Sequence, residues 1–335
     1  MIIDLPDTST QVLTKRLRTL REERGEVTSG RVLTLIVVAD GHEDIDAILD
    51  NLHDASREHP ARIILLVTHR DSEDPKLDGE IRMGGDAGAS EMIVMHLHGE
   101  MAAHRASVVT PLLLPDTPIV AWWPGKGPRN PSADPIGALA QRRITDAFVD
   151  GDTDAFYRRR LVYTPGDSDL VWSRITLWRA ALASLVEQPP HEDVHSVELY
   201  GPANDPAVDI AAGWLADRLD VPVSRKNSDS NSQTDDNGED TVGIHKAILN
   251  RASGPATVEV LDAHTVSMNV NGKTSLVTLS RRHLSDCLAE ELRHLEPDDT
   301  YGRALRRLVR VHREGRSRHT AANLPPVDNE EGSNR

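Results

Sequence analysis

The apolar residues in the first part of the chain follow two different spacings. Residues 31–39 and 62–68 are almost continuously apolar and rich in β-branched side chains, which is typical of strands covered on both faces. Between them, Ile45, Ile48 and Leu49 start an i, i+3, i+4 pattern that predicts one face of a helix. A strand, a helix and a strand in succession favour a parallel sheet with right-handed crossovers.

The rest of the first half extends this sheet and adds helices to it. We expect an edge pair of strands at 77–83 and 91–98 and a further strand at 118–123. Periodic apolar positions predict helices around residues 12–20 and 45–52 and over 99–109, 155–161 and 171–186. The first half is therefore predicted to be an α/β domain with a mostly parallel, Rossmann-like sheet.

A second set of elements follows Gln188-Pro189-Pro190, and this proline pair predicts a domain boundary. The later elements are expected as strands at 194–200, 242–249, 257–261, 265–270 and 275–279 and helices at 205–219, 283–295 and 301–312. The dipeptide Asn271-Gly272 joins the last two strands and is typical of a hairpin turn. We predict an N-terminal domain over 1–188 and a smaller, mixed α/β domain over 191–313.

Two segments are too polar to be expected in a core. Residues 227–240 contain five acids, no base and no large apolar side chain. A segment of this composition cannot bury enough surface to offset the entropy it would lose on ordering. We therefore predict a disordered acidic insertion at 227–240 and a disordered tail at 314–335.

Composition and charge narrow the class of protein. The chain has 335 residues, of which 38% are hydrophobic and 27% charged, as expected of a globular protein with about two domains. Its 53 acids against 38 bases give a net charge of −15, which disfavours nucleic acid and anionic membranes as partners. No apolar run exceeds five residues, and no signal-like segment begins the sequence, so we expect a cytoplasmic protein with no membrane span.

Motifs that would indicate catalysis or a bound cofactor are missing from the sequence. There is no dinucleotide fingerprint, no P-loop and no nucleophile-elbow motif. The glycine cluster 84–88 lacks the dinucleotide spacing and is interpreted as a hairpin turn. Cys287 is the single cysteine, which excludes an internal disulfide and a multi-thiolate metal site. We expect no catalytic residues and no cofactor in this chain.

Two polar clusters leave more than one interpretation open. His96 and His98 would share a strand face, with His104 nearby, and could present imidazoles to zinc. A solvent-facing strand end is the default interpretation, and we expect no metal site. Arginines recur at i, i+3, i+4 and i+7 near the end of the chain: Arg303, Arg306, Arg307 and Arg310. They form either a solvated helix face that offsets nearby acids or a site for an acidic partner or a phosphorylated ligand.

Trp122 and Trp123 are adjacent in a sequence that contains only 11 aromatic residues in total, five of them Trp. Neighbouring residues on a strand point to opposite faces of the sheet. We therefore expect one indole to fill the core and the other to be covered by the proline-rich loop, by another domain or by a partner. Core packing alone and a binding hot spot both stay open as explanations of the pair.

Several longer motifs resemble one protein family. The strongest is TPLLLPDTPIVAWWPG at 110–125, followed by DPIG at 134–137, RRITDA at 142–147 and VWSRITLWRA at 171–180. The segments IDLPDT at 3–8 and EELRHLEPD at 290–298 agree as well. By these motifs the chain resembles the glucose-6-phosphate dehydrogenase assembly protein family, OpcA, in its actinobacterial form.

The resemblance implies a non-catalytic partner that binds glucose-6-phosphate dehydrogenase and enables its activity in the pentose phosphate pathway. NADP then belongs to the partner enzyme. The thiol control associated with cyanobacterial relatives is not carried over, because Cys287 has no second cysteine to pair with.

The matched motifs also supply candidate contact residues for the dehydrogenase. These are Trp122, Trp123, Arg142, Arg143, Trp172 and Arg174. The alternative is a sugar-phosphate-binding sensor or enzyme that uses arginine clusters and the helix N-terminus after Gly201-Pro202.

Overall fold

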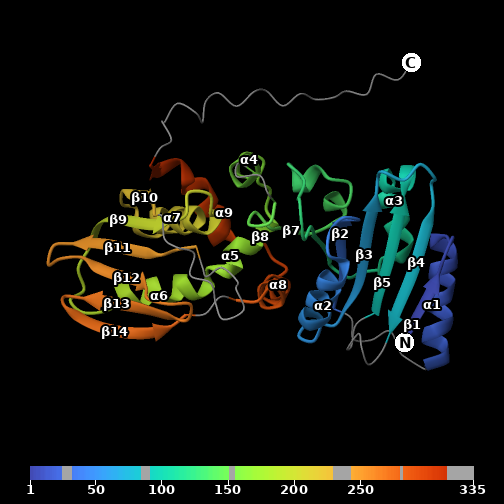
Figure 1. The fold of residues 1–335 in the computed structure, drawn as a ribbon, viewed down its shortest axis with the longest axis horizontal. Helices are drawn as coiled ribbons and strands as arrows, with labels where there is room; N and C mark the ends of the chain where they lie inside the picture. The colour runs from blue at the N-terminus through green and yellow to red at the C-terminus, as the bar shows by residue number, and fades with distance from the viewer. Residues whose placement is uncertain (25–31, 84–90, 151–154, 229–242, 280–281, 315–335) are drawn as a thin grey trace, which may run out of the picture.

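A computed structural model describes residues 1–24, 32–83, 91–150, 155–228, 243–279 and 282–314. In these ranges the chain forms two β-sheets with helices packed against them (Figure 1). The glycine cluster, most of the predicted acidic insertion and the predicted tail beyond residue 314 lie outside the described residues.

The first sheet is mixed. In spatial order its strands are β1 (Ile2–Leu5), β4 (Leu77–Met83), β5 (Glu91–His98), β3 (Ala61–His69), β2 (Leu33–Asp40), β6 (Ile119–Trp122), β7 (Arg142–Thr145) and β8 (Asp167–Asp169). The pairings from β5 to β8 are parallel, whereas β1 and β4 run antiparallel at one edge. The α/β class is confirmed, but the predicted Rossmann-like parallel character is not, because the sheet is mixed.

The second sheet is also mixed. In spatial order its strands are β14 (Lys273–Thr278), β13 (Thr265–Val270), β12 (Ala256–Val260), β11 (Lys246–Arg251), β9 (Val194–Gly201), β10 (Val223–Asn227) and β15 (Val311–Arg313). Only the pairings of β10 with β9 and with β15 are parallel. The predicted hairpin turn is present, since Asn271 and Gly272 have φ of 52° and 78°, the positive values that a type I′ turn requires.

The helices are mostly short. They are α1 (Thr10–Arg24), α2 (Ile45–Ser56), α3 (Arg105–Val109), α4 (Ala155–Leu161), α5 (Leu170–Arg174), α6 (Thr176–Val186), α7 (Pro206–Leu219), α8 (Leu284–Arg293) and α9 (Asp299–Arg307). Short 3₁₀ turns are η2 (Gly99–Ala103), η3 (Thr110–Leu112), η4 (Pro131–Ala133), η5 (Gly137–Leu139) and η6 (Leu308–Arg310). None of the helices in the described ranges combines the length and apolarity that a membrane span requires.

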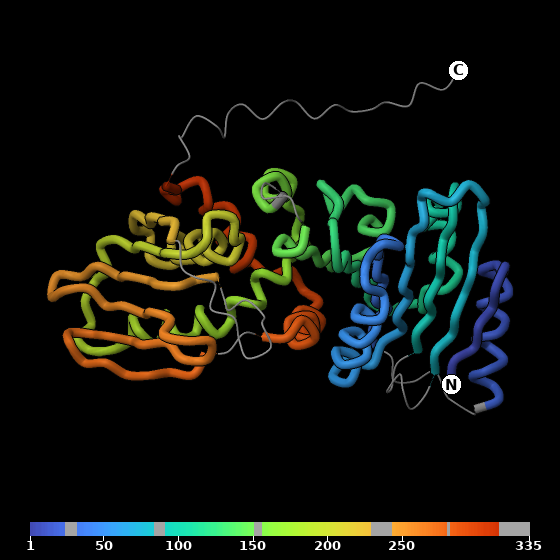
Figure 2. Tube along the Cα trace, in the orientation of Figure 1, coloured from blue at the N-terminus to red at the C-terminus, as the bar shows by residue number. Residues whose placement is uncertain are grey.

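Both faces of the first sheet are covered, which is why β2 and β3 are apolar along almost their whole length. On one face lie α1, α3 and η3, with Leu13, Leu17 and Val109 in the core. On the other face α2 packs beside α8, which contributes Leu288 and Leu292 from far along the chain. Figure 2 shows that the chain comes back to the first sheet late in the sequence: the orange-red α8 lies next to the blue α2.

The two cores exchange helices across the predicted boundary at 188–190. Helix α6 precedes that boundary, yet Trp178 and Leu182 pack in the core of the second sheet with α7 and α9. Helix α8 follows the boundary and covers the first sheet. The division into 1–188 and 191–313 stays a prediction. Two of the three hydrophobic cores formed by the described residues take side chains from both ranges, and the third lies within 1–188.

Several predicted elements differ from the structure. The helix expected over 99–109 is divided into η2 and α3. The helix expected over 171–186 breaks at Ile175 into α5 and α6. Ile175 is both the C-cap of α5 and the N-cap of α6. The helix expected to reach residue 312 ends at Arg307, and residues 311–313 join the second sheet beside β10 instead. The predicted acidic insertion begins too early, because Asn227 belongs to β10 and pairs with Gly201.

Candidate functional site

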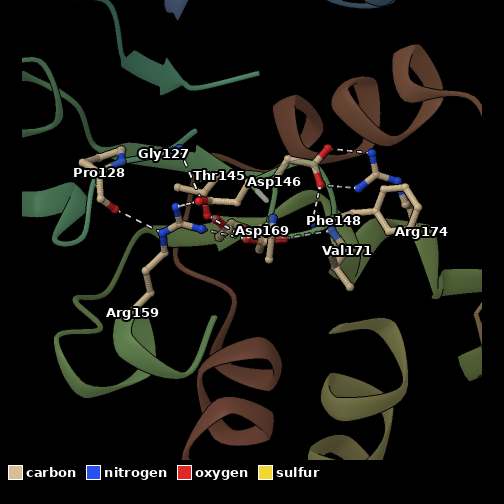
Figure 3. A network of polar contacts seen from close by, with 12 residues as sticks. Gly127, Pro128, Thr145, Asp146, Phe148, Arg159, Asp169, Val171 and Arg174 are labelled. Atoms are coloured by element: carbon tan, nitrogen blue, oxygen red, sulfur yellow. Dashed lines mark hydrogen bonds and ion pairs between the residues drawn. The ribbon is translucent and has the colours of Figure 1, made fainter. Parts of the chain in front are cut away.

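A network of buried acids and arginines lies where β7 and β8 end (Figure 3). These strands are parallel neighbours, so their carboxyl ends meet at one edge of the sheet, where α/β proteins place their functional loops. Asp146 follows β7 directly, and Asp169 is the last residue of β8. Both carboxylates are almost completely buried.

Asp169 lies at the centre of this network. Its carboxylate accepts hydrogen bonds from the Thr145 hydroxyl at 2.7 Å and from the backbone N–H groups of Ala147 and Val171, each at 3.1 Å. It therefore caps α5 and fixes the start of the loop after β7 at the same time. Burial, and then the negative charge of Asp146, raise the pKa of Asp169 to about 6.

Two arginines balance the neighbouring acids. Arg174 donates to both carboxylate oxygens of Asp146 at 2.6 Å, the paired geometry that makes this kind of contact strong. Burial opposes the charge of Arg174, but Asp146 more than offsets it and raises the pKa of the guanidinium. On the other side, Arg159 from α4 forms an ion pair with Asp150 and donates to the Pro128 carbonyl at 3.1 Å.

The loop held by this network exposes two apolar side chains, Phe148 and Val149, which we call the 148–149 tip. Their residues are 41% and 48% exposed. The backbone N–H of Phe148 donates to the Asp146 carboxylate at 3.2 Å. The central guanidinium carbon of Arg174 lies 5.4 Å from the centroid of the phenyl ring (Figure 3). Buried polar contacts thus lie directly beneath an exposed aromatic ring.

A second buried ion pair joins the first sheet to α8. Arg142 on β7 contacts Glu291 on α8 at 2.5 Å, and the hydroxyls of Ser168 and Ser173 donate to the same carboxylate at 2.6 and 2.5 Å. Arg142 also donates to the backbone carbonyl of Glu296 at 3.1 Å. This arginine therefore positions α8 on the sheet.

The other candidate contact residues are equally occupied within the chain. Arg143 forms an ion pair with Asp167. The Trp172 indole N–H donates to Asp298 at 2.7 Å, and the Arg179 guanidinium lies 3.6 Å from the Trp172 ring centroid. The first contact joins β7 to β8, and the other two join α5 to the N-cap of α9 and to α6.

The tryptophan pair lies on the sheet as strand alternation predicts. Trp122 and Trp123 do lie on opposite faces of the sheet, in separate hydrophobic cores. Both indoles are buried. Arg142, Arg143, Trp172 and Arg174 are also buried or nearly so, and contact of these six residues with the dehydrogenase stays a prediction.

Comparison with family models decides the family. The model described as "Glucose-6-phosphate dehydrogenase subunit N-terminal domain" matches residues 52–161, and its counterpart for the C-terminal domain of the same protein matches residues 165–305. The chain belongs to the OpcA family. The resemblance found in the sequence is thereby confirmed. The two OpcA models meet between residues 161 and 165, ahead of α5 and α6.

Other comparisons add no functional information to this OpcA chain. None of the curated proteins compared matches it. Among solved structures, a Gfo/Idh/MocA family oxidoreductase from Vibrio cholerae is 11% identical with a TM-score of 0.35, covering 82% of this chain and 94% of the other. An apo scyllo-inositol dehydrogenase from Lactobacillus casei is 10% identical with a TM-score of 0.37, covering 84% and 94%. TM-scores this low do not establish a common fold.

Three histidines of the OpcA chain, His69, His96 and His98, lie together at the ends of β3 and β5. His69 lies 2.9 Å from His96 between ring nitrogens, and its ring stacks on His98 at 4.5 Å between centroids. His104 points elsewhere, 3.9 Å from Glu100. Within the described ranges, no group of three or more histidine, cysteine or acidic side chains is arranged to hold a metal ion.

The two predicted anion sites are filled by the chain's own acids. Arg303 and Arg307 both contact Asp217, at 3.0 and 3.6 Å, and Arg310 contacts Asp220 at 3.0 Å. The N-terminus of α7, after Gly201-Pro202, is capped by the Asp205 carboxylate, which accepts from the Ala207 N–H at 2.8 Å. A phosphate would have to displace this carboxylate. Of the two interpretations of the arginine cluster, the structure favours a face that offsets nearby acids.

The patterns along the sequence do not reveal the 148–149 tip. One signal was available: the chain contains only two phenylalanines, and Phe148 follows directly on the RRITDA motif. Its exposure could not be foreseen, because it depends on Asp169 and Arg174, which come from other elements.

Proposed function

We propose that this OpcA-family chain is a non-catalytic partner that binds glucose-6-phosphate dehydrogenase and enables its activity. The observation that carries the proposal is that two consecutive models, each named for a subunit of that enzyme, match most of the chain. NADP and the sugar phosphate then bind to the dehydrogenase, and the two proteins meet in the cytoplasm. The absence of a dinucleotide fingerprint from the sequence supports the assignment of NADP binding to the dehydrogenase.

We further propose the 148–149 tip as a contact point for the dehydrogenase. Three properties support it: Phe148 is an exposed aromatic, Val149 extends the apolar surface beside it, and the loop beneath is held by buried ion pairs. Rigid aromatic anchors carry much of the binding free energy at protein interfaces. A loop that is already ordered loses little entropy on binding.

The test is a binding titration and a kinetic assay with purified dehydrogenase. We expect Phe148→Ala to weaken binding by about 2 kcal/mol, roughly thirtyfold, and to change the unfolding free energy by less than about 1 kcal/mol. Leu177→Ala is the matched control, because Leu177 on α6 is an exposed apolar residue of the same fractional exposure, 41%. The control should bind like the parent.

The outcomes separate the two proposals. If the parent chain neither copurifies with the dehydrogenase nor changes its rate, the partner function is wrong. If the parent binds and Phe148→Ala binds equally well, the function stands and the contact lies elsewhere. Reduction of NADP by the purified chain alone with glucose-6-phosphate would contradict the non-catalytic role.

A further inference from the structure

Strand β14 forms an outer edge of the second sheet and differs from the other sheet edges. Its six residues are all exposed, and it pairs only with β13 in the described part of the chain. The three other outermost strands, β1, β8 and β15, are four, three and three residues long. A long exposed edge is a template for a further strand.

One hydrogen bond shows which N–H and C=O groups of β14 point toward β13 and which point to the open edge. Just beyond the strand, the N–H of Leu279 donates to the His264 carbonyl at 2.8 Å, in the same register as the β13–β14 pairs. Backbone groups of successive residues in a strand point to opposite sides. Residues 275 and 277 therefore face β13, whereas the N–H and C=O groups of Thr274, Leu276 and Thr278 point to the open edge.

The side chains on this edge lack the features that usually prevent strand pairing. The hairpin over 265–278 has no acid, although the chain carries 53 of them, and no proline. Its single charge is Lys273, at the turn end of the strand. Leu276, in the middle of β14, is 66% exposed. A neutral strip on a chain of net charge −15 is a surface on which two copies of that chain would repel each other least.

We propose that β14 pairs antiparallel with β14 of a second copy of this chain, about a twofold axis at Leu276. Centring on Leu276 is the register that uses all three outward-pointing residues of each strand. It places Leu276 opposite Leu276 and Thr274 opposite Thr278, and Lys273 falls opposite Leu279. No like charges meet, and leucine–leucine and threonine–threonine pairs are favourable across strands. The second sheet of one copy and the second sheet of the other then form one continuous sheet.

Sedimentation of the full chain tests the association. We expect the parent to be dimeric at roughly 10 µM. Leu276→Lys places two ammonium groups opposite each other on the axis and should weaken the dimer at least about tenfold. Val309→Lys is the matched control: Val309 is 67% exposed, and it lies in η6 near the opposite edge of the sheet. It should dimerise like the parent.

Cross-linking tests the register without adding charge. Cys287 is buried, so a new surface cysteine is the reactive thiol. Two Leu276→Cys residues should be joined by a bismaleimide with a span of about 8 Å. Two Thr274→Cys residues lie roughly 14 Å apart along the strands in this register and should not be joined.

A parent that stays monomeric at roughly 100 µM overturns the proposal, as does a dimer that is indifferent to Leu276→Lys and cross-links equally at both positions. Leu276→Lys could instead lose dehydrogenase binding with no change in self-association. That result would assign the edge of β14 to a strand of the enzyme and would also overturn the proposal.

Discussion

Asp169 is a charged group held where water does not reach, and its ionisation is coupled to folding. Because its pKa is raised to about 6 in the folded chain, against an ordinary value of 3.8, the native state binds this proton more tightly than the unfolded state. Its contribution to stability is therefore present below about pH 4 and is lost as the pH rises to about 6. The loss amounts to about 3 kcal/mol.

We predict that Asp169→Asn removes this part of the pH dependence. Urea unfolding of the parent and the variant between pH 4 and 7 should give free energies whose difference changes across that window, because the amide cannot titrate. The amide oxygen can accept from the N–H groups of Ala147 and Val171 as the neutral carboxyl does, so the two curves should lie closest together at the acidic end. Two parallel curves would contradict the prediction.

At the same scale, Trp122 and Trp123 show what a local sequence pattern can predict and what it cannot. Strand alternation correctly places the two indoles on opposite faces of the sheet. Whether a face is covered depends on helices that arrive from elsewhere: α8 covers the Trp122 face from more than 160 positions along the chain. No pattern around residue 122 contains that information.

At the scale of elements, α8 is attached to the first sheet by two ion pairs in different surroundings. Arg142–Glu291 is buried, whereas Arg293–Glu58 is more than half exposed at both side chains. Removing one partner of a buried pair leaves an uncompensated charge, which costs about 3–5 kcal/mol. Removing one partner of an exposed pair costs about 1 kcal/mol or less.

We predict that Arg142→Met lowers the free energy of unfolding by about 3–5 kcal/mol and that Arg293→Met, the matched control, lowers it by less than about 1 kcal/mol. Adding Glu291→Leu to Arg142→Met should recover part of the loss, because the isolated carboxylate is then gone. Denaturant unfolding measures all three variants. Equal losses from Arg142→Met and Arg293→Met would show that burial of the first pair is unimportant.

Element types were more predictable than their ends. The buried strands β2 and β3 and the amphipathic α2 follow from periodicity alone. The strand at 311–313 does not, because its residues continue a helical arginine pattern and are drawn into the sheet only by pairing with β10. The candidate contact residues stay a prediction: the matched motifs locate a region, but burial within it is decided by contacts such as Arg142 with Glu291.

At the scale of the whole molecule, the exchange of α6 and α8 between the two cores makes each core depend on the other. We predict a single cooperative unfolding transition in calorimetry, with equal calorimetric and van't Hoff enthalpies. A fragment of residues 1–188 lacks α8 and carries α6 without its sheet, so it should show no cooperative transition. Two separate transitions of the full chain, or a fragment that melts like a native protein, would contradict this.

The late position of α8 also has a consequence for how the protein is made. The strands of the first sheet have left the ribosome once residue 169 has emerged, but the helix that covers one of their faces begins at Leu284. Roughly a hundred residues must still be translated, which at about 5–20 residues per second takes on the order of 5–20 s. For that interval a face lined by Leu35, Ile63 and Trp122 is only partly covered. Nascent chains should therefore need chaperones most strongly in this window, and slower translation of the second half would extend their exposure.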